Sequence, residues 1–249
     1  MTPADFLATN GGLRAYNAAR DNLRKVLTAM SLVGHHIMQR AYGYNIWEGF
    51  QPNRLTPDLQ GWNGDHPSLE RLAAAPTGAG TVVVDVGVWK GQSTITMANA
   101  MRRAGIDGCV IAVDTFLGSA ENWSGPGALF SRQHGLPDLY TTFLNNVYAA
   151  GLTEYIVPLP QTSSVAALIL QRMQITAAVV HIDAAHEYED VIRDASAYWE
   201  ILALGGYLIG DDYHETWPGV VRAAGEFSAK VGRPLNVDGP KWILQKPAA

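Results

Sequence analysis

The sequence has little that would tie it to a membrane, a nucleic acid or an oxidising compartment. It contains one cysteine, Cys109, so no internal disulfide can form, and the apolar neighbours of this residue predict a reduced core thiol. Its 18 Lys and Arg residues are scattered and the formal net charge is -5, which argues against binding a phosphate backbone. No apolar run reaches the roughly eighteen residues of a membrane helix, and the N-terminus lacks an export signal. We therefore expect a cytoplasmic protein with no nucleic-acid or membrane partner.

The chain divides into two parts by its hydrophobic pattern. Apolar residues recur at helical spacing over about 12–42, which predicts one or two amphipathic helices. Residues 45–67 are rich in Pro, Gly, Asn and Trp and predict an irregular linker. We expect residues 1–66 to form a helical extension with a linker, and 67–249 to form the main domain around one core. An apolar extension of this kind often packs on a second subunit, so we expect a homo-oligomer.

From residue 81 onward, short β-branched runs alternate with longer helical windows. This alternation predicts an α/β fold with a doubly wound, mainly parallel sheet. A helix over 188–202 is expected to end at Gly205 and Gly206. The tail predicts a β-hairpin at the sheet edge, with Asp238-Gly239 as its turn. The expected strands of the parallel sheet are 82–86, 110–113, 155–157, 178–182 and 207–209.

The first of these strands runs into a turn that carries Gly87 and Gly91. In an open α/β sheet such a turn lies at the mouth of the ligand crevice. A dinucleotide fingerprint would need glycine at position 89, where the backbone approaches a pyrophosphate, but Trp89 stands there. S-adenosylmethionine has no pyrophosphate, so the turn suits it better than NAD. Asp114, at the end of the next strand, can accept both hydroxyls of a ribose. The alternatives are a turn without a ligand and an aspartate that merely caps a helix.

Acidic residues follow two later strands that we expect to be neighbours. Asp183 follows one strand, and Asp211 and Asp212 follow the other, so their carboxylates should converge. A divalent cation such as Mg²⁺ would relieve their repulsion. His186 lies three residues beyond Asp183, and a histidine, with an ordinary pKa of about 6.5, suits removal of a proton from a hydroxyl. The alternatives are that the aspartates cap helices and that His186 bonds a nearby carbonyl. His181, inside a buried run, is expected to be a core histidine.

A segment of irregular composition, 117–137, directly follows the candidate ribose-binding acid. Loops of that length are usually covers of active sites or disordered segments, and its position favours a cover. Trp123 and Phe130 within it, with Tyr213 and Trp217 after the acidic pair, could line an apolar substrate wall or simply pack.

Three runs of sequence resemble a known family. The runs Asp85-Val-Gly-Val-Trp-Lys-Gly-Gln-Ser, Asp114-Thr-Phe-Leu-Gly-Ser and Pro160-Gln-Thr-Ser resemble bacterial class I methyltransferases related to macrocin-type and mycinamicin-type sugar O-methyltransferases. The likeness covers about residues 67–246. It implies a Rossmann-like seven-stranded sheet and a catalytic domain that binds S-adenosylmethionine.

The resemblance also implies roles for particular residues. Asp85, Gly87 and Gly91 would surround the methionine part of the cofactor, Asp114 its ribose, and Thr162 or Ser163 its adenine, with Asp183 also near the cofactor. Enzymes of this type bind Mg²⁺ through acids that match Asp183, Asp211 and Asp212, with a base at the position of His186. The implied reaction is methylation of a hydroxyl on a small molecule, such as a sugar or a glycosylated natural product.

Three other functions stay open at this stage. A metal-independent methyltransferase would use His186 alone, with the acids as helix caps. A protein that binds the cofactor without catalysis would make its main contacts through the N-terminal helices. An NAD oxidoreductase is disfavoured by Trp89.

Overall fold

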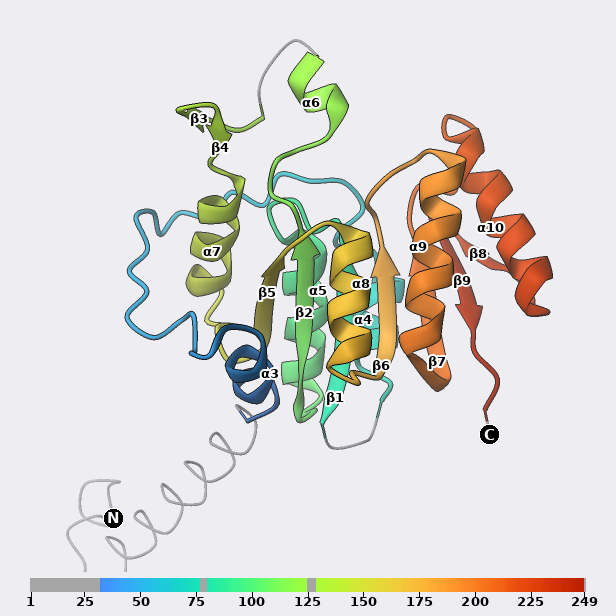
Figure 1. Cartoon of the computed structure of the whole chain (residues 1–249), viewed down its shortest axis with the longest axis horizontal. Coiled ribbons are helices and arrows are strands. Elements are labelled where there is room, and N and C mark those ends of the chain that lie inside the picture. The colour runs from blue at the N-terminus through green and yellow to red at the C-terminus, as the bar shows by residue number, and fades with distance from the viewer. Residues whose placement is uncertain (1–31, 77–79, 125–128, 249) are drawn as a thin grey trace, which may run out of the picture.

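A seven-stranded sheet forms the centre of the molecule, in a computed structural model that describes residues 32–76, 80–124 and 129–248. The strand order is β5-β2-β1-β6-β7-β9-β8 (Figure 1). The first five of these strands are parallel. Their bounds are β1 Thr81–Val86, β2 Gly108–Asp114, β5 Ile156–Pro160, β6 Ala177–Ile182 and β7 Leu202–Gly210. The doubly wound, mainly parallel α/β fold expected from the alternating pattern is therefore confirmed.

The last two strands form the predicted hairpin at one edge of the sheet. Strand β9 (Lys241–Gln245) runs antiparallel to β7, and β8 (Asn236–Asp238) pairs with β9 as the outer strand. Gly239 between them has a φ of 60°, a left-handed value that glycine adopts without strain. The sheet edge is thereby closed by a short strand, as is usual for exposed edges.

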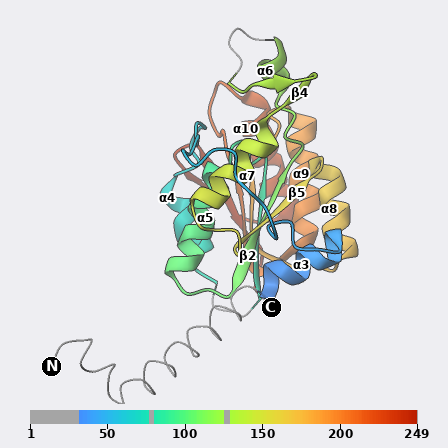
Figure 2. The same cartoon turned by 90° about the vertical axis from the view of Figure 1, so that its left-hand side faces the viewer.

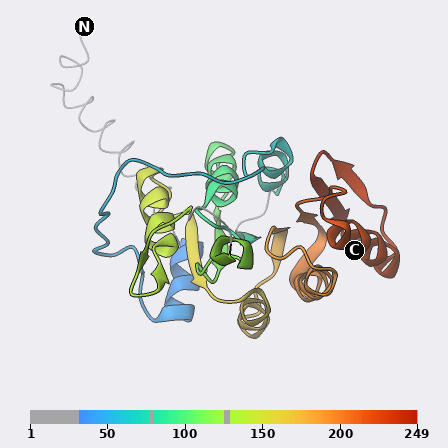
Figure 3. The same cartoon turned by 90° about the horizontal axis from the view of Figure 1, so that it is seen from above.

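Helices cover both faces of the sheet, as Figures 2 and 3 show from the side and from above. Strand β1 is buried throughout, which is typical of a parallel strand covered on both faces. Alternate β1 residues enter two separate cores: Val84 faces α8 and α9, whereas Val83 faces α4 and α5. The helices on the first face are α3 (Leu32–Tyr42), α8 (Ser163–Arg172), α9 (Tyr188–Ile201) and α10 (Pro218–Val231). Those on the second are α4 (Pro67–Ala73), α5 (Gln92–Arg103) and α7 (Leu139–Ala149).

The glycines expected to end the helix before β7 lie inside the strand instead, so that prediction was wrong. Helix α9 ends at Ile201, and β7 begins directly at Leu202. Gly205 has a φ of 77°, and the pairing with β6 shifts register at this end of the strand. A Cβ on Gly206 would lie 2.8 Å from the carbonyl oxygen of Ala178. Glycine within a strand commonly marks such an irregularity or a close approach of backbones.

The described part of the N-terminal extension packs on the sheet. The Tyr42 hydroxyl donates to the carbonyl of Pro158, and the Trp47 indole N–H donates to that of Ile156. The predicted helical window over 12–42 is described only from α3 onward; its earlier part lies outside the described residues. In the described part of the chain, no helix combines the length and apolar character needed to cross a bilayer.

The described residues of the irregular segment 117–137 stand above the end of the sheet where the parallel strands finish (Figure 1). Its described residues include the short helix α6 (Ala120–Ser124) and the hairpin of β3 (Arg132–Gln133) and β4 (Leu136–Pro137), whereas no element was expected here. The Arg132 guanidinium lies over the rings of Trp123, at 4.4 Å, and Phe130, at 4.6 Å. This contact ties the two parts of the segment together.

Candidate active site

The glycine turn follows β1 and is shaped by contacts with the protein itself. Gly87 has a φ of 85°, and a Cβ there would lie 1.8 Å from the carbonyl oxygen of Asp183. Gly91, with a φ of 94°, directly precedes α5, and a Cβ there would lie 2.8 Å from the ring of Phe143. Both positions therefore need glycine for the turn to pack at all. The packing also fixes the turn directly against the end of β6.

Trp89 occupies the middle of this turn with an unusual backbone. Its φ is 52°, which is uncommon for a bulky side chain and is found most often at functional sites. Its backbone N–H donates to Oδ2 of Asp114 at 2.8 Å, and its ring lies edge-on to Phe130 with the centroids 5.7 Å apart. The turn and the end of β2 are thus joined through one residue.

Asp114 ends β2 with its carboxylate held in a fixed orientation. Besides the bond from Trp89, its Oδ1 accepts the N–H of Phe116 at 2.7 Å. Burial raises the pKa of this carboxyl, although the backbone N–H groups that donate to it act in the opposite direction. Each carboxylate oxygen has a second lone pair, so Asp114 can still accept two hydroxyls. An oriented acceptor pair beside a glycine turn is what a ribose diol requires.

The Asp85 side chain lies inside the core, below the glycine turn, and its expected role beside the methionine part of the cofactor stays a prediction. This side chain is fully buried and accepts hydrogen bonds from Ser93 Oγ at 2.8 Å and Thr94 Oγ1 at 2.5 Å. His181 Nδ1 lies 2.7 Å from its other oxygen. The carboxylate therefore joins β1, α5 and β6 inside the core. His181 is itself fully buried, so its prediction as a core histidine is confirmed.

Thr162 and Ser163 lie where the chain passes from β5 into α8, and their side chains make hydrogen bonds to residues of α8 and α9. Thr162 Oγ1 accepts from the N–H of Val165 at 3.3 Å, which is the usual role of a residue that caps a helix. Ser163 Oγ donates to Asp194 of α9 at 2.5 Å. These bonds place both residues at the carboxyl end of the sheet, the edge that also holds Asp114.

The acids after β6 and β7 form two separate groups that share Asp183. One group joins Asp183 to His186 and Asp212, and the other joins it to His181 and Asp211; in each, one ligand atom per residue lies within 4.8 Å of the others. Burial, and then the nearby charge of Asp211, raise the pKa of Asp183 well above its ordinary value. The expected convergence of acidic residues is present, but the structure divides it between an outer and a buried group.

Lys241 neutralises Asp211 and was not anticipated from the sequence. This lysine of β9 is fully buried and donates to Oδ2 of Asp211, while its Nζ lies 3.2 Å from His181 Nε2. Because an ammonium group only donates, Nε2 accepts, and the proton on Nδ1 then points to Asp85. A continuous chain of polar contacts thus runs from Asp85 through His181 and Lys241 to Asp211. These contacts hold the Asp211 side chain inside the protein.

The outer group contains a histidine held on two sides. His186 Nε2 lies 2.9 Å from Oδ2 of Asp212. The ring of Trp217 stacks on the imidazole with centroids 4.0 Å apart and an interplanar angle of 30°. Both contacts fix the plane of the imidazole ring. A small cavity lies here, lined by Asp183, His186 and Asp212 among others. An oriented histidine beside two carboxylates can move a proton or contribute to a cation site.

The comparisons with known proteins identify a methyltransferase domain in this chain. Residues 84–213 match a family model described as a methyltransferase domain. The solved O-methyltransferase NovP is 23% identical, with a TM-score of 0.56, over 72% of this chain and 78% of that chain. The calicheamicin methyltransferase CalS11 is 18% identical, with a TM-score of 0.52, over 72% of this chain and 76% of that chain. An O-methyltransferase from Bacillus cereus, solved with SAH, is 14% identical, with a TM-score of 0.51, over 86% of this chain and 90% of that chain. Among curated proteins, none matches this sequence.

Proposed function

This chain belongs to the methyltransferase-domain family, and we propose that it methylates a hydroxyl group of a small molecule with S-adenosylmethionine as the methyl donor. The observation that carries the proposal is the pair of His186 and Asp212, 2.9 Å apart at the end of β7. This pair stands beside a turn whose Gly87 packs on Asp183. A proton acceptor and a nucleoside site therefore share one edge of the sheet.

The residues around the glycine turn fit the cofactor. S-adenosylmethionine supplies a methyl group on a sulfonium centre, together with a ribose diol. Asp114 offers its two remaining acceptor positions for that diol, and Trp89 keeps the carboxylate in place. Gly87 and Gly91 let the turn pack closely against Asp183 and Phe143, which holds its backbone at this edge of the sheet. Asp85 supports the turn from inside the core through its bonds with Ser93, Thr94 and His181.

His186 has the setting of a general base. Its imidazole removes the proton of the acceptor hydroxyl, and Asp212 stabilises the imidazolium that results. Trp217 stacks on the imidazole, which fixes the plane of the ring during the proton transfer. S-adenosylmethionine held beside Asp114 and the glycine turn would supply the methyl group to the acceptor oxygen that His186 has deprotonated. Positioning of this kind contributes a large part of such rate enhancements.

A divalent cation fits the outer group better than the set expected from the sequence. Asp183 and Asp212 offer carboxylate oxygens within 4.8 Å of each other and of His186, whereas Asp211 is taken by Lys241. Mg²⁺ bound there would polarise an acceptor hydroxyl. Burial, and then the charge of Asp211, raise the pKa of Asp183, and a bound cation would stabilise its ionised form. We therefore propose Asp183 and Asp212 as the metal ligands.

A sugar is the acceptor class that we propose. CalS11 carries the description TDP-rhamnose 3'-O-methyltransferase, and NovP is an O-methyltransferase. At these identities the two proteins share the fold with this chain, so the substrate class is carried here as a hypothesis. A glycosylated natural product would present the vicinal hydroxyls that a base and a cation can bind together.

Transfer of labelled methyl groups tests the proposal. The protein is incubated with methyl-labelled S-adenosylmethionine and a panel of nucleoside-diphosphate sugars and glycosides, with Mg²⁺ or with EDTA. The variant His186→Gln should lower kcat by about 10²- to 10⁴-fold while SAH binding stays unchanged. The control is His36→Gln, which changes an exposed histidine of α3. Full activity of His186→Gln would show that His186 is not the general base. Full activity in EDTA would show that the reaction needs no divalent cation.

We also propose that the protein is a homo-oligomer of the cytoplasm. Support for assembly comes from the amphipathic pattern of the N-terminal extension, and support for a reducing compartment from the single cysteine, which is buried. Light scattering after size-exclusion chromatography measures the mass in solution. A mass of one chain, 26.9 kDa, would contradict the assembly.

A further inference from the structure

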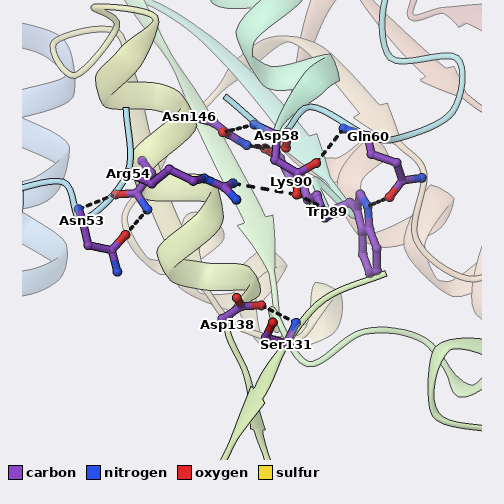
Figure 4. Close-up of polar contacts among 10 residues, drawn as sticks. Asn53, Arg54, Asp58, Gln60, Trp89, Lys90, Ser131, Asp138 and Asn146 are labelled. Atoms are coloured by element: carbon purple, nitrogen blue, oxygen red, sulfur yellow. Dashed lines mark hydrogen bonds and ion pairs between the residues drawn. The ribbon is translucent and has the colours of Figure 1, made fainter. Parts of the chain in front are cut away.

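A segment of the linker lies against the glycine turn and contacts two consecutive residues of it (Figure 4). Asp58 Oδ2 lies 2.9 Å from Nζ of Lys90, and Gln60 Oε1 accepts the indole N–H of Trp89 at 3.3 Å. We call Asp58, Gln60, Lys90 and Asn146 the linker clasp. No local sequence pattern connects the linker with this turn, because about thirty residues separate them.

Asn146 of α7 closes the clasp from the other side. Its Nδ2 donates to the carbonyl oxygens of Asp58 and Lys90, both at 2.8 Å, and its Oδ1 accepts the N–H of Asp58 at 2.9 Å. One side-chain amide thus bonds to the linker and to the turn at the same point. Asn146 is 1% exposed, so these bonds are shielded from water. The turn cannot move relative to the linker without breaking them.

The buried charge of Lys90 makes loss of its ion pair with Asp58 energetically costly. Lys90 is 4% exposed, although lysine is rarely buried without a partner. The bond from Lys90 lowers the pKa of Asp58, although burial acts in the opposite direction, so the acid is ionised at neutral pH. Removing the acid would leave a buried ammonium without its counter-charge, and Lys90 would then move toward water.

Movement of Lys90 would be transmitted to the candidate nucleoside site through its peptide bond with Trp89. Lys90 directly follows Trp89, whose left-handed backbone directs its N–H to Asp114 at 2.8 Å. That bond is one of two that orient the carboxylate. A displaced turn would release Asp114 from the orientation that suits a ribose diol.

We propose that the linker clasp positions the glycine turn for the nucleoside, so that the affinity for S-adenosylmethionine depends on contacts made by the linker. The residues of the clasp are positioning residues. The inference rests on the proposed function, because it takes Asp114 as the group that binds the ribose. It also requires reciprocity: a bound nucleoside must stabilise the linker as much as the linker favours binding.

Calorimetric titration of SAH into the full chain tests the clasp. Asp58→Asn should weaken SAH binding about tenfold or more, within the 5- to 150-fold range typical of coupled sites. Asp58→Glu keeps the charge and should recover most of the affinity. The matched control is Glu70→Gln, the same chemical change in the exposed ion pair of Glu70 with Arg103, and it should bind SAH like the wild type.

A milder variant and a second measurement cover the case in which Asp58→Asn does not fold. Gln60→Ala removes only the bond to the Trp89 indole and should weaken SAH binding about threefold, as loss of one ordinary hydrogen bond does. In hydrogen–deuterium exchange, SAH should slow exchange over residues 53–62 in the wild type and much less in Gln60→Ala.

Two outcomes overturn the inference, and they are distinguishable. If wild-type protein binds SAH and both linker variants bind it equally well, the clasp does not position the site. If the wild-type protein itself does not bind SAH, the proposed function fails and the inference fails with it.

Discussion

Replacement of Lys241 by methionine should strongly destabilise the protein, and the cost can be worked out from its surroundings. The side chains of Lys241 and Asp211 are 0% and 2% exposed, so the pair is removed from solvent. Breaking a buried pair by removal of one partner costs about 3–5 kcal/mol, since the remaining charge stays without compensation. Methionine fills a similar volume, so little of this cost arises from a cavity. His181 Nε2 loses its donor in the same change.

The matched double variant separates charge from packing. Asp211→Asn added to Lys241→Met removes the stranded carboxylate, so the combined cost should fall to about 1–2 kcal/mol, far below the sum of the single costs. Lys230→Met, an exposed lysine of α10, is the control and should change stability by less than about 0.5 kcal/mol. Urea denaturation at pH 7 gives the free energy of unfolding of each variant. A cost below about 1 kcal/mol for Lys241→Met, or additive costs in the double variant, would refute this account.

Two further predictions concern the turn and the carboxylates. Gly87→Ala should lower the free energy of unfolding in urea by at least about 3 kcal/mol, because the new Cβ would collide with the Asp183 carbonyl. The control is Gly105→Ala, at a glycine that is also left-handed but lies in open space, and it should cost only about 1–2 kcal/mol. Equal costs for the two variants would contradict the packing argument. The pKa of Asp183 is raised in the folded state by burial and by Asp211, so its contribution to stability is complete below the ordinary aspartate pKa of about 4 and is lost as the pH rises through the raised value. Asp183→Asn should therefore gain stability relative to the wild type as the pH rises above about 4 in EDTA, and a pH-independent difference would count against it.

Much of the fold was predictable because local sequence patterns indicate its strands, helices and turns. The β-branched runs and the glycine turn led to the parallel sheet, and the resemblance to methyltransferases is confirmed by the match of residues 84–213 to a methyltransferase-domain model. The boundary of β7 was missed because Gly205 and Gly206 look like a helix end when read alone. Their role in a strand irregularity depends on β6, which the local pattern does not contain.

The candidate site was predictable in its position and less so in its partners. Topology alone brings Asp183, Asp211 and Asp212 to one edge of the sheet. Which acid faces outward is decided by Lys241, a residue thirty positions from Asp211 that appears in the sequence as one more charge in a hairpin. The burial of Asp85 depends in the same way on His181, which lies 96 positions away. The division of the chain at residue 67 stays a prediction.

Titration of SAH into wild-type protein and into Asp114→Asn tests the central claim most directly. We expect one binding site per chain in the wild type. The variant should bind about tenfold to a hundredfold more weakly, since hydrogen bonds to a charged acceptor are worth about 1.5–3 kcal/mol. Binding of equal strength in the two proteins, or no binding by the wild type, would contradict the claim that the glycine turn and Asp114 hold the nucleoside.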